Sequence, residues 1–175
     1  ALEIRKAELG DRYPDTASSL NNLAGLYRSQ GRYGEAEPLL VQALEIWKAE
    51  LGDRHPDTAS SLNNLAGLYD SQGRYGEAEP LYLQALEITK AELGDRHPST
   101  ATSLNNLALL YANTNRLPEA AITMSEALSI VESMLGSVHP YALKSKESLK
   151  AIQEAIKSSA KPDSIFGRIK KRWFS

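Results

Sequence analysis

Residues 43–84 read ALEIWKAELGDRHPDTASSLNNLAGLYDSQGRYGEAEPLYLQ, and residues 1–42 repeat this stretch with five differences. The differing pairs are Arg5/Trp47, Tyr13/His55, Arg28/Asp70, Leu40/Tyr82 and Val41/Leu83. Further copies begin at Ala85 and, more weakly, at Ala127. A fixed period of about 20–50 residues is typical of a solenoid, in which each unit buries its apolar face only against its neighbours. The repeat therefore predicts a linear array, and it favours a function on a surface over one in a catalytic pocket.

Composition restricts the class of protein further. Hydrophobic residues make up 42% of the chain and charged residues 24%, values typical of a folded, soluble protein. The net charge of −2 argues against a general nucleic-acid binder, and no stretch approaches the roughly 20 apolar residues of a membrane span. The absence of cysteine removes disulfides and thiolate metal sites and fits a reducing compartment. We therefore expect a cytoplasmic protein without a cofactor.

Prolines and glycines divide each unit into two helices. Pro14 and its equivalents, 42 residues apart, mark helix starts, because a first turn tolerates the missing N–H of proline. From Pro14, apolar residues recur at i, i+3, i+4 and i+7, and Gly31 and Gly52 suit helix ends. The predicted helices cover 1–9, 14–30, 33–51, 56–72, 75–93, 98–114, 117–135 and 140–158. The residues predicted to be buried are Leu20, Leu23, Tyr27, Ala36, Leu40, Ala43 and their equivalents.

The fourth unit departs most from the others. Lys146 and Lys150 replace Leu104 and Ala108, whereas Leu149, Ile152 and Ile156 keep one apolar face. This pattern predicts a terminal capping helix, with one side packed and the other in water. The expected organisation is the end of a truncated repeat at 1–9, three full units at 10–52, 53–94 and 95–136, a capping helix at 137–160 and a basic amphipathic tail at 161–175.

The units resemble tetratricopeptide repeats of the 42-residue type found in kinesin light chains and their bacterial, notably cyanobacterial, relatives. The matching residues are Leu-Gly-Asp-Arg-His-Pro-Asp-Thr-Ala at 51–59, Leu-Asn-Asn-Leu-Ala at 62–66, Leu-Tyr at 68–69 and Gly-Arg-Tyr-Gly-Glu-Ala-Glu-Pro-Leu at 73–81. The resemblance covers about residues 1–142. It implies an all-α, right-handed superhelical solenoid of antiparallel helix pairs, in which the first helix of each pair lines a concave groove. In this family the groove takes up extended peptide segments of partner proteins.

Three asparagine pairs are the main candidate site: Asn21 and Asn22, Asn63 and Asn64, and Asn105 and Asn106. Asparagine is a poor helix former, so two together in mid-helix are a costly local choice. The pairs point away from the apolar stripe, towards the expected groove. An amide offers both a donor and an acceptor to the backbone of an extended peptide. The alternative is that these amides bond each other or neighbouring helices.

Arg28, Asp70 and Asn113 are further groove candidates. The exchange of Arg28 for Asp70 between two nearly identical units either reverses the charge preference along the groove or is a neutral surface change. Clustered lysines and arginines that would clamp a terminal carboxylate are missing from this groove. We therefore expect recognition of an internal peptide segment.

Metal and catalytic roles find little support. His55, His97 and His139 each precede a helix-starting proline, in loops at least about 8–10 Å apart, which is too far to share a zinc ion bound at about 2 Å. Helix capping or loop packing is favoured. No phosphate-binding loop, zinc-protease motif or nucleophile elbow is present, so we expect no enzyme.

The tail allows three interpretations. Residues 161–175 carry a net charge of +4 against −6 for residues 1–160, and Ile165, Ile169 and Trp173 recur every four residues. Such a segment packs on its own solenoid or a neighbouring copy, lies on an anionic membrane, or stays unstructured. We favour a short helix at 164–174 packed on protein. The favoured function is a scaffold that binds a partner's extended segment, and the alternative is a structural, self-associating array within a larger sensor or scaffold.

Overall fold

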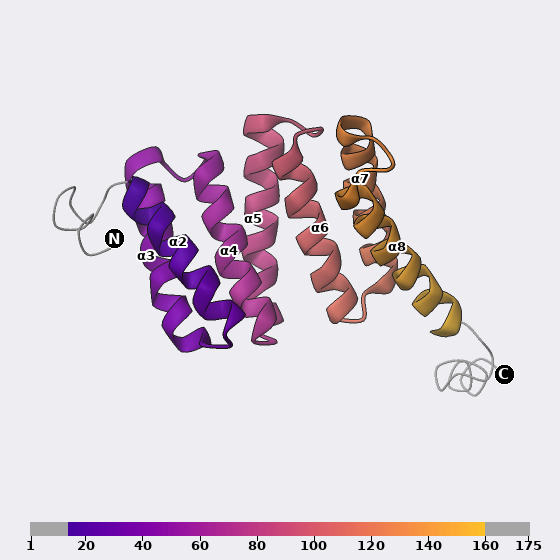
Figure 1. The fold of residues 1–175 in the computed structure, drawn as a ribbon, viewed down its shortest axis with the longest axis horizontal. Helices are drawn as coiled ribbons and strands as arrows, with labels where there is room; N and C mark the ends of the chain where they lie inside the picture. The colour runs from indigo at the N-terminus through magenta and orange to yellow at the C-terminus, as the bar shows by residue number, and fades with distance from the viewer. Residues whose placement is uncertain (1–13, 160–175) are drawn as a thin grey trace.

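The computed structural model describes residues 14–159, which form seven α-helices and no strand (Figure 1). The helices are α2 (Pro14–Ser29), α3 (Tyr33–Leu51), α4 (Pro56–Ser71), α5 (Tyr75–Leu93), α6 (Pro98–Asn113), α7 (Leu117–Leu135) and α8 (Pro140–Ser159). Each predicted helix in this range is confirmed to within one residue at its ends. The helix predicted at 1–9 and the tail helix predicted at 164–174 lie outside the described residues.

The helices follow one another as pairs along a single row, from α2 and α3 at one end to α8 at the other (Figure 1). Among the described helices, α4 and α6 each pack against the second helix of their own pair and against the second helix of the preceding pair. First helices also contact each other, α2 with α4 and α4 with α6. The fold is therefore the predicted all-α solenoid of helix pairs, without a central core.

Local sequence explains where the helices begin and end. Gly31 adopts a left-handed conformation with φ of 73° directly after α2, and Asn115 takes the equivalent place after α6 with φ of 60°. Glycine adopts positive φ without steric cost, and asparagine tolerates it better than most residues. Each of these residues turns the chain so that the second helix packs back on the first.

Burial along the repeat agrees with the predicted stripe except at the first unit. Leu20, Ala36, Leu40 and Ala43 are buried, but Leu23 is only half-buried. Its equivalent Leu65 is 5% exposed, because it joins a cluster with residues of the preceding pair.

Tyr27, also expected to be buried, is half-buried as well. The guanidinium of Arg32 stacks on its ring, with Cζ 4.2 Å from the ring centroid. Tyr69 and Tyr111 hold Arg74 and Arg116 in the same way, at 4.0 and 4.1 Å. Tyr27 and Tyr69 are thus half-buried platforms for a cation at the rim of the core, whereas Tyr111 is 9% exposed and belongs to the core itself.

The stacked arginines also link neighbouring units. Nη1 of Arg74 donates to Glu37 of the preceding unit at 2.8 Å, and its Nε donates to Glu77 at 2.7 Å. Nη1 of Arg116 donates to Glu79 at 2.6 Å in the equivalent arrangement. The hydrogen bond from Arg74 lowers the pKa of the Glu77 carboxyl. Position in the first turn of a helix would by itself suggest that Glu37 and Glu79 only interact with the helix dipole. Their bonds to Arg74 and Arg116 show that they also connect neighbouring pairs.

The last described helix has the predicted one-sided packing. Ile152 is buried, and Leu149 and Ile156 pack beside it on a cluster that includes Met124 of α7. No helix among residues 14–159 is long and apolar enough to cross a membrane.

Candidate functional site: the first-helix face

The first helices present a polar face along the array, which we call the first-helix face. Its members come from α2, α4 and α6: Asn21, Asn22, Gly25, Arg28, Asn63, Asn64, Gly67, Asp70, Asn105, Asn106 and Asn113. All of them are exposed or half-buried, whereas Leu62 and Leu65 on the other side of α4 are buried. The apolar stripe thus directs the asparagine pairs away from the core.

The two members of each pair have different surroundings. Asn63 is half-buried, and its Nδ2 donates to Oγ of the buried Ser103 on α6 at 2.9 Å. Asn64, its neighbour, is exposed and makes no hydrogen bond to the described residues. Asn63 thus joins one first helix to the next, while Asn64 is open to solvent. The possibility that these amides bond neighbouring helices therefore applies to the first member of this pair.

Two amide carbonyls on this face lack a partner. The Oδ1 atoms of Asn21 and Asn63 are buried and accept no hydrogen bond from the described residues. A buried acceptor without a partner costs about 1–3 kcal/mol, so such groups need an explanation. Both atoms belong to half-buried side chains of the first-helix face.

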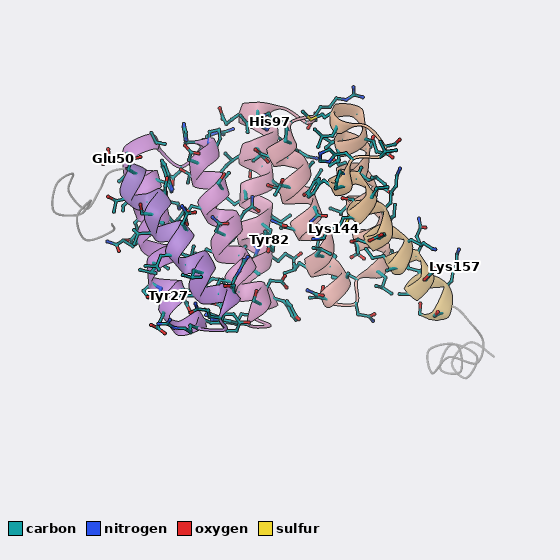
Figure 2. The ribbon with its side chains drawn as sticks, viewed as in Figure 1. Tyr27, Glu50, Tyr82, His97, Lys144 and Lys157 are labelled. Atoms are coloured by element: carbon teal, nitrogen blue, oxygen red, sulfur yellow. The ribbon has the colours of Figure 1, made fainter. Side chains whose placement is uncertain are left out.

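Asp70 is held by a residue two helices further along the chain. Nδ2 of Asn113 donates to Oδ1 of Asp70 at 3.2 Å, which joins α6 to α4. The carboxylate also acts on Tyr82 below it, whose side chain is 3% exposed. The pKa of Tyr82 is raised to about 12, mainly by burial and in part by the nearby Asp70, while Arg28 acts to lower it. Figure 2 shows Tyr82 in the middle of the array.

Arg28 reaches over the adjacent helix α4. A Cβ atom at Gly67 would lie 2.6 Å from Nη1 of Arg28 and 3.4 Å from the Tyr82 hydroxyl. The missing side chain at Gly67 therefore makes room for the guanidinium. Arg28 and Asp70 thus flank the Tyr82 hydroxyl. Two of the five differences between the first two units, Arg28/Asp70 and Leu40/Tyr82, therefore lie close together here.

The first unit is hollow where the second is filled. A cavity of about 40 Å³ is lined by Asn21, Ala24, Gly25, Arg28, Leu40 and Asn64. Its equivalent in the second unit contains Tyr82 in place of Leu40. A Cβ atom at Gly25 would meet no atom within 4 Å, whereas one at Gly67 would lie 3.4 Å from the Tyr82 hydroxyl, so the first-helix face is not the same from unit to unit.

The recurring histidines cap helices, as predicted. Nδ1 of His55 accepts from the backbone N–H of Asp57 at 3.2 Å. His97 and His139 accept from the N–H two residues ahead at 3.1 and 3.2 Å. Each side chain thereby satisfies one of the backbone donors left open at a helix start.

The period and the paired-helix geometry agree with a known family. The tetratricopeptide repeat model matches residues 1–48, 15–91 and 71–133. The chain belongs to the tetratricopeptide repeat family. Proteins with these repeats commonly mediate protein–protein interactions. No match was found among curated proteins.

Solved tetratricopeptide repeat structures resemble this one closely. A putative kinesin light chain from Podosopora anserina with nearly identical TPR-like repeats has 30% identity and a TM-score of 0.77, over 83% of this chain and 69% of that one. BtubC (BKLC) from P. vanneervenii has 27% identity and a TM-score of 0.77, over 88% and 62%. The first TPR of Spaghetti (RPAP3), at 16% identity and a TM-score of 0.59 over 83% and 96%, shares the fold alone. The kinesin light chain-like assignment is thus confirmed.

Some residues of this face are not evident from sequence. Ser103 lies 40 residues after its partner Asn63, a separation that a 42-residue repeat brings to adjacent first helices. Tyr82 belongs to a second helix but reaches the first-helix face. The signal for Tyr82 was its appearance, together with Asp70, among the five differences between otherwise matching units.

Proposed function

We propose that the first-helix face binds an extended segment of a partner protein, without catalysis. The observation that carries this proposal is the row of Asn22, Asn64 and Asn106, one per unit, which all point to solvent or lie half-buried without a partner among the described residues. Each amide can donate to a peptide carbonyl and accept from a peptide N–H. Contacts of this kind grip a backbone without demanding a particular sequence.

In the second unit the first asparagine of the pair supports the second. Because Asn63 bonds to Ser103, α4 and α6 are held at a fixed distance, and the exposed amides keep a fixed spacing. A site whose groups are already in place loses less conformational entropy on binding. Structural and binding roles are thus divided between adjacent residues of one pair.

The structure of a related repeat supports a peptide ligand. The first TPR of Spaghetti (RPAP3) is bound to the HSP90 peptide SRMEEVD, and that protein shares the fold with this chain. The first-helix face here contains Arg28 and Asp70, of opposite charge, rather than a group of cations. An internal segment therefore suits this face better than a terminal carboxylate.

The proposal is tested by selecting peptides from a random display library on the immobilised full chain. Selected peptides are then titrated against the double variant Asn64→Ala, Asn106→Ala. The matched control is Glu45→Ala, Glu87→Ala, a pair with the same spacing on exposed positions of the second helices. We expect the asparagine variant to lose about tenfold or more in affinity, equivalent to about 1.4 kcal/mol, and the control to bind as the parent does. Equal binding by both variants would contradict the proposal.

A further inference from the structure

The side of α8 that faces away from α7 still has features that, in the other units, receive a second helix. Leu143 is 46% exposed, although its equivalents Ala59 and Ala101 are 0% and 1% exposed beneath α5 and α7. Val138, 81% exposed, stands where Arg54 reaches Glu92 at the end of the next second helix at 3.1 Å. These apolar residues therefore lie where a further second helix would pass.

A hollow marks the place where such a helix would begin. It measures about 240 Å³ and is lined by Asn115, Leu117, Pro118, Ile156 and Ser159. Ser159 is the last residue of α8, which runs four residues beyond the position equivalent to Asn113, the last residue of α6. The described chain thus ends at the edge of the hollow, directly before the amphipathic tail.

The tail matches the repeat at the positions that form the core. Phe166, Ile169 and Trp173 follow Met124, Ala127 and Val131 by 42 residues, and all three α7 residues are buried. Three of the five buried positions of α7 thus carry an apolar residue in the tail. Trp173 is also the equivalent of Trp47, which packs in one cluster with Ala17, the counterpart of Leu143.

An ion pair between successive second helices has a counterpart in the sequence with its two charges exchanged. Nζ of Lys90 on α5 lies 2.7 Å from Oε1 of Glu126 on α7. The residues 42 positions later are Glu132 and Arg168. A tail packed as a second helix would therefore bring opposite charges together at this point again.

We propose that residues 162–174 form the second helix of a fourth unit, packed on the outward side of α8 of the same molecule. Pro162 suits the first turn, Asp163 favours the helix start, and Lys170 and Lys171 favour the helix end. The occupant is this segment because it combines the apolar spacing, the exchanged ion pair and a starting point at the hollow.

Two positions make this unit weaker than the others. Lys146 stands where Leu104 is buried, and Arg172 stands where Ile130 is buried. Lys146 is drawn aside by Glu132, with Nζ 2.7 Å from Oε1. The fourth unit therefore opens more readily than the units before it.

The two tryptophans of the chain provide the test. Trp47→Phe leaves Trp173 as the sole tryptophan, which is excited selectively at the long-wavelength edge of the protein absorbance, and the fold accepts this change because the equivalent residues are Thr89 and Val131. We expect Trp173 to be shielded from acrylamide in the full chain. Leu143→Lys should raise its quenching constant about threefold by releasing the packed segment. Ile122→Lys, at a 70% exposed position of α7, is the matched control and should change nothing.

A second variant and a mass measurement keep the test decisive. Arg168→Glu places two carboxylates together and should also raise quenching, while circular dichroism of both variants stays that of the parent. Light scattering should give the mass of one chain whenever Trp173 is shielded. Quenching as complete as that of a free tryptophan amide, with no response to Leu143→Lys, would overturn the proposal. So would shielding that disappears on dilution together with a dimer mass, because a second copy would then cover α8.

Discussion

Replacing Asn63 with alanine separates the structural asparagine from the exposed one beside it. The change removes the 2.9 Å bond to Ser103 and leaves a buried hydroxyl without its donor. An intramolecular hydrogen bond contributes about 0.5–1.5 kcal/mol net, and an unsatisfied buried group costs about 1–3 kcal/mol. Alanine returns up to about 0.7 kcal/mol through its better helix propensity. In the variant, the Ser103 hydroxyl can still donate to a backbone carbonyl of its own helix. The equivalent Ser145 does so, donating to the Tyr141 carbonyl at 3.0 Å.

Alanine also removes the buried, unpaired Oδ1 of Asn63, which offsets part of this cost, so the expected net loss for Asn63→Ala is about 0.5–1 kcal/mol of unfolding free energy. Asn64→Ala, one residue further on, has no bond to lose and should leave stability unchanged or raise it by a few tenths of a kcal/mol. Urea denaturation followed by circular dichroism at 222 nm measures both. An Asn63→Ala chain as stable as the parent, or an equal loss in both variants, would refute the division of roles.

Three further changes test other parts of the structure. Leu65→Ala should cost about 2–5 kcal/mol in urea denaturation because Leu65 is 5% exposed, whereas Leu26→Ala at a 52% exposed position should cost far less; equal losses would show that the core is misplaced. Gly25→Ala should raise stability by about 0.5–1 kcal/mol, because a Cβ there meets no atom within 4 Å, and a lower melting temperature would contradict the open surface. Burial raises the pKa of Tyr82 to about 12 from about 10 in an unfolded chain, so its stabilising contribution is complete below pH 10 and is lost as the pH rises through 12. Burial also raises the pKa of Tyr69 and Tyr111, so the absorbance titration of Tyr82→Phe should lose only its latest component, near pH 12. A titration unchanged by that substitution would place Tyr82 in water.

The repeat explains why the helices could be predicted so closely. Pro56 and its equivalents fix helix starts, and Gly73 or Asn115 turns the chain at the end of the first helix, because few other residues tolerate positive φ. These are local effects that depend on neighbouring residues only. The histidine caps belong to the same class, since Nδ1 and the bonded N–H are two residues apart.

Contacts between units were harder to predict. Nothing local connects Asn63 with Ser103 or Arg74 with Glu37, which lie 40 and 37 residues apart. Whether these side chains come into contact depends on how far each helix pair is displaced along the array, and this displacement cannot be predicted from the length of the repeat alone. The expected burial of Leu23 failed for a related reason, since an apolar residue is buried only where the preceding unit covers it.

The central claim is that the exposed amides of the first-helix face contact the backbone of a bound segment. The most direct test is nuclear magnetic resonance of the ¹⁵N-labelled chain titrated with a selected peptide, with the side-chain amides assigned through single Asn→Asp variants. We predict that the Nδ2 signals of Asn64 and Asn106 shift with the peptide, while backbone signals around Glu45 and Glu87 on the second helices stay in place. Shifts confined to the second helices, with the asparagine amides unmoved at saturation, would contradict the account.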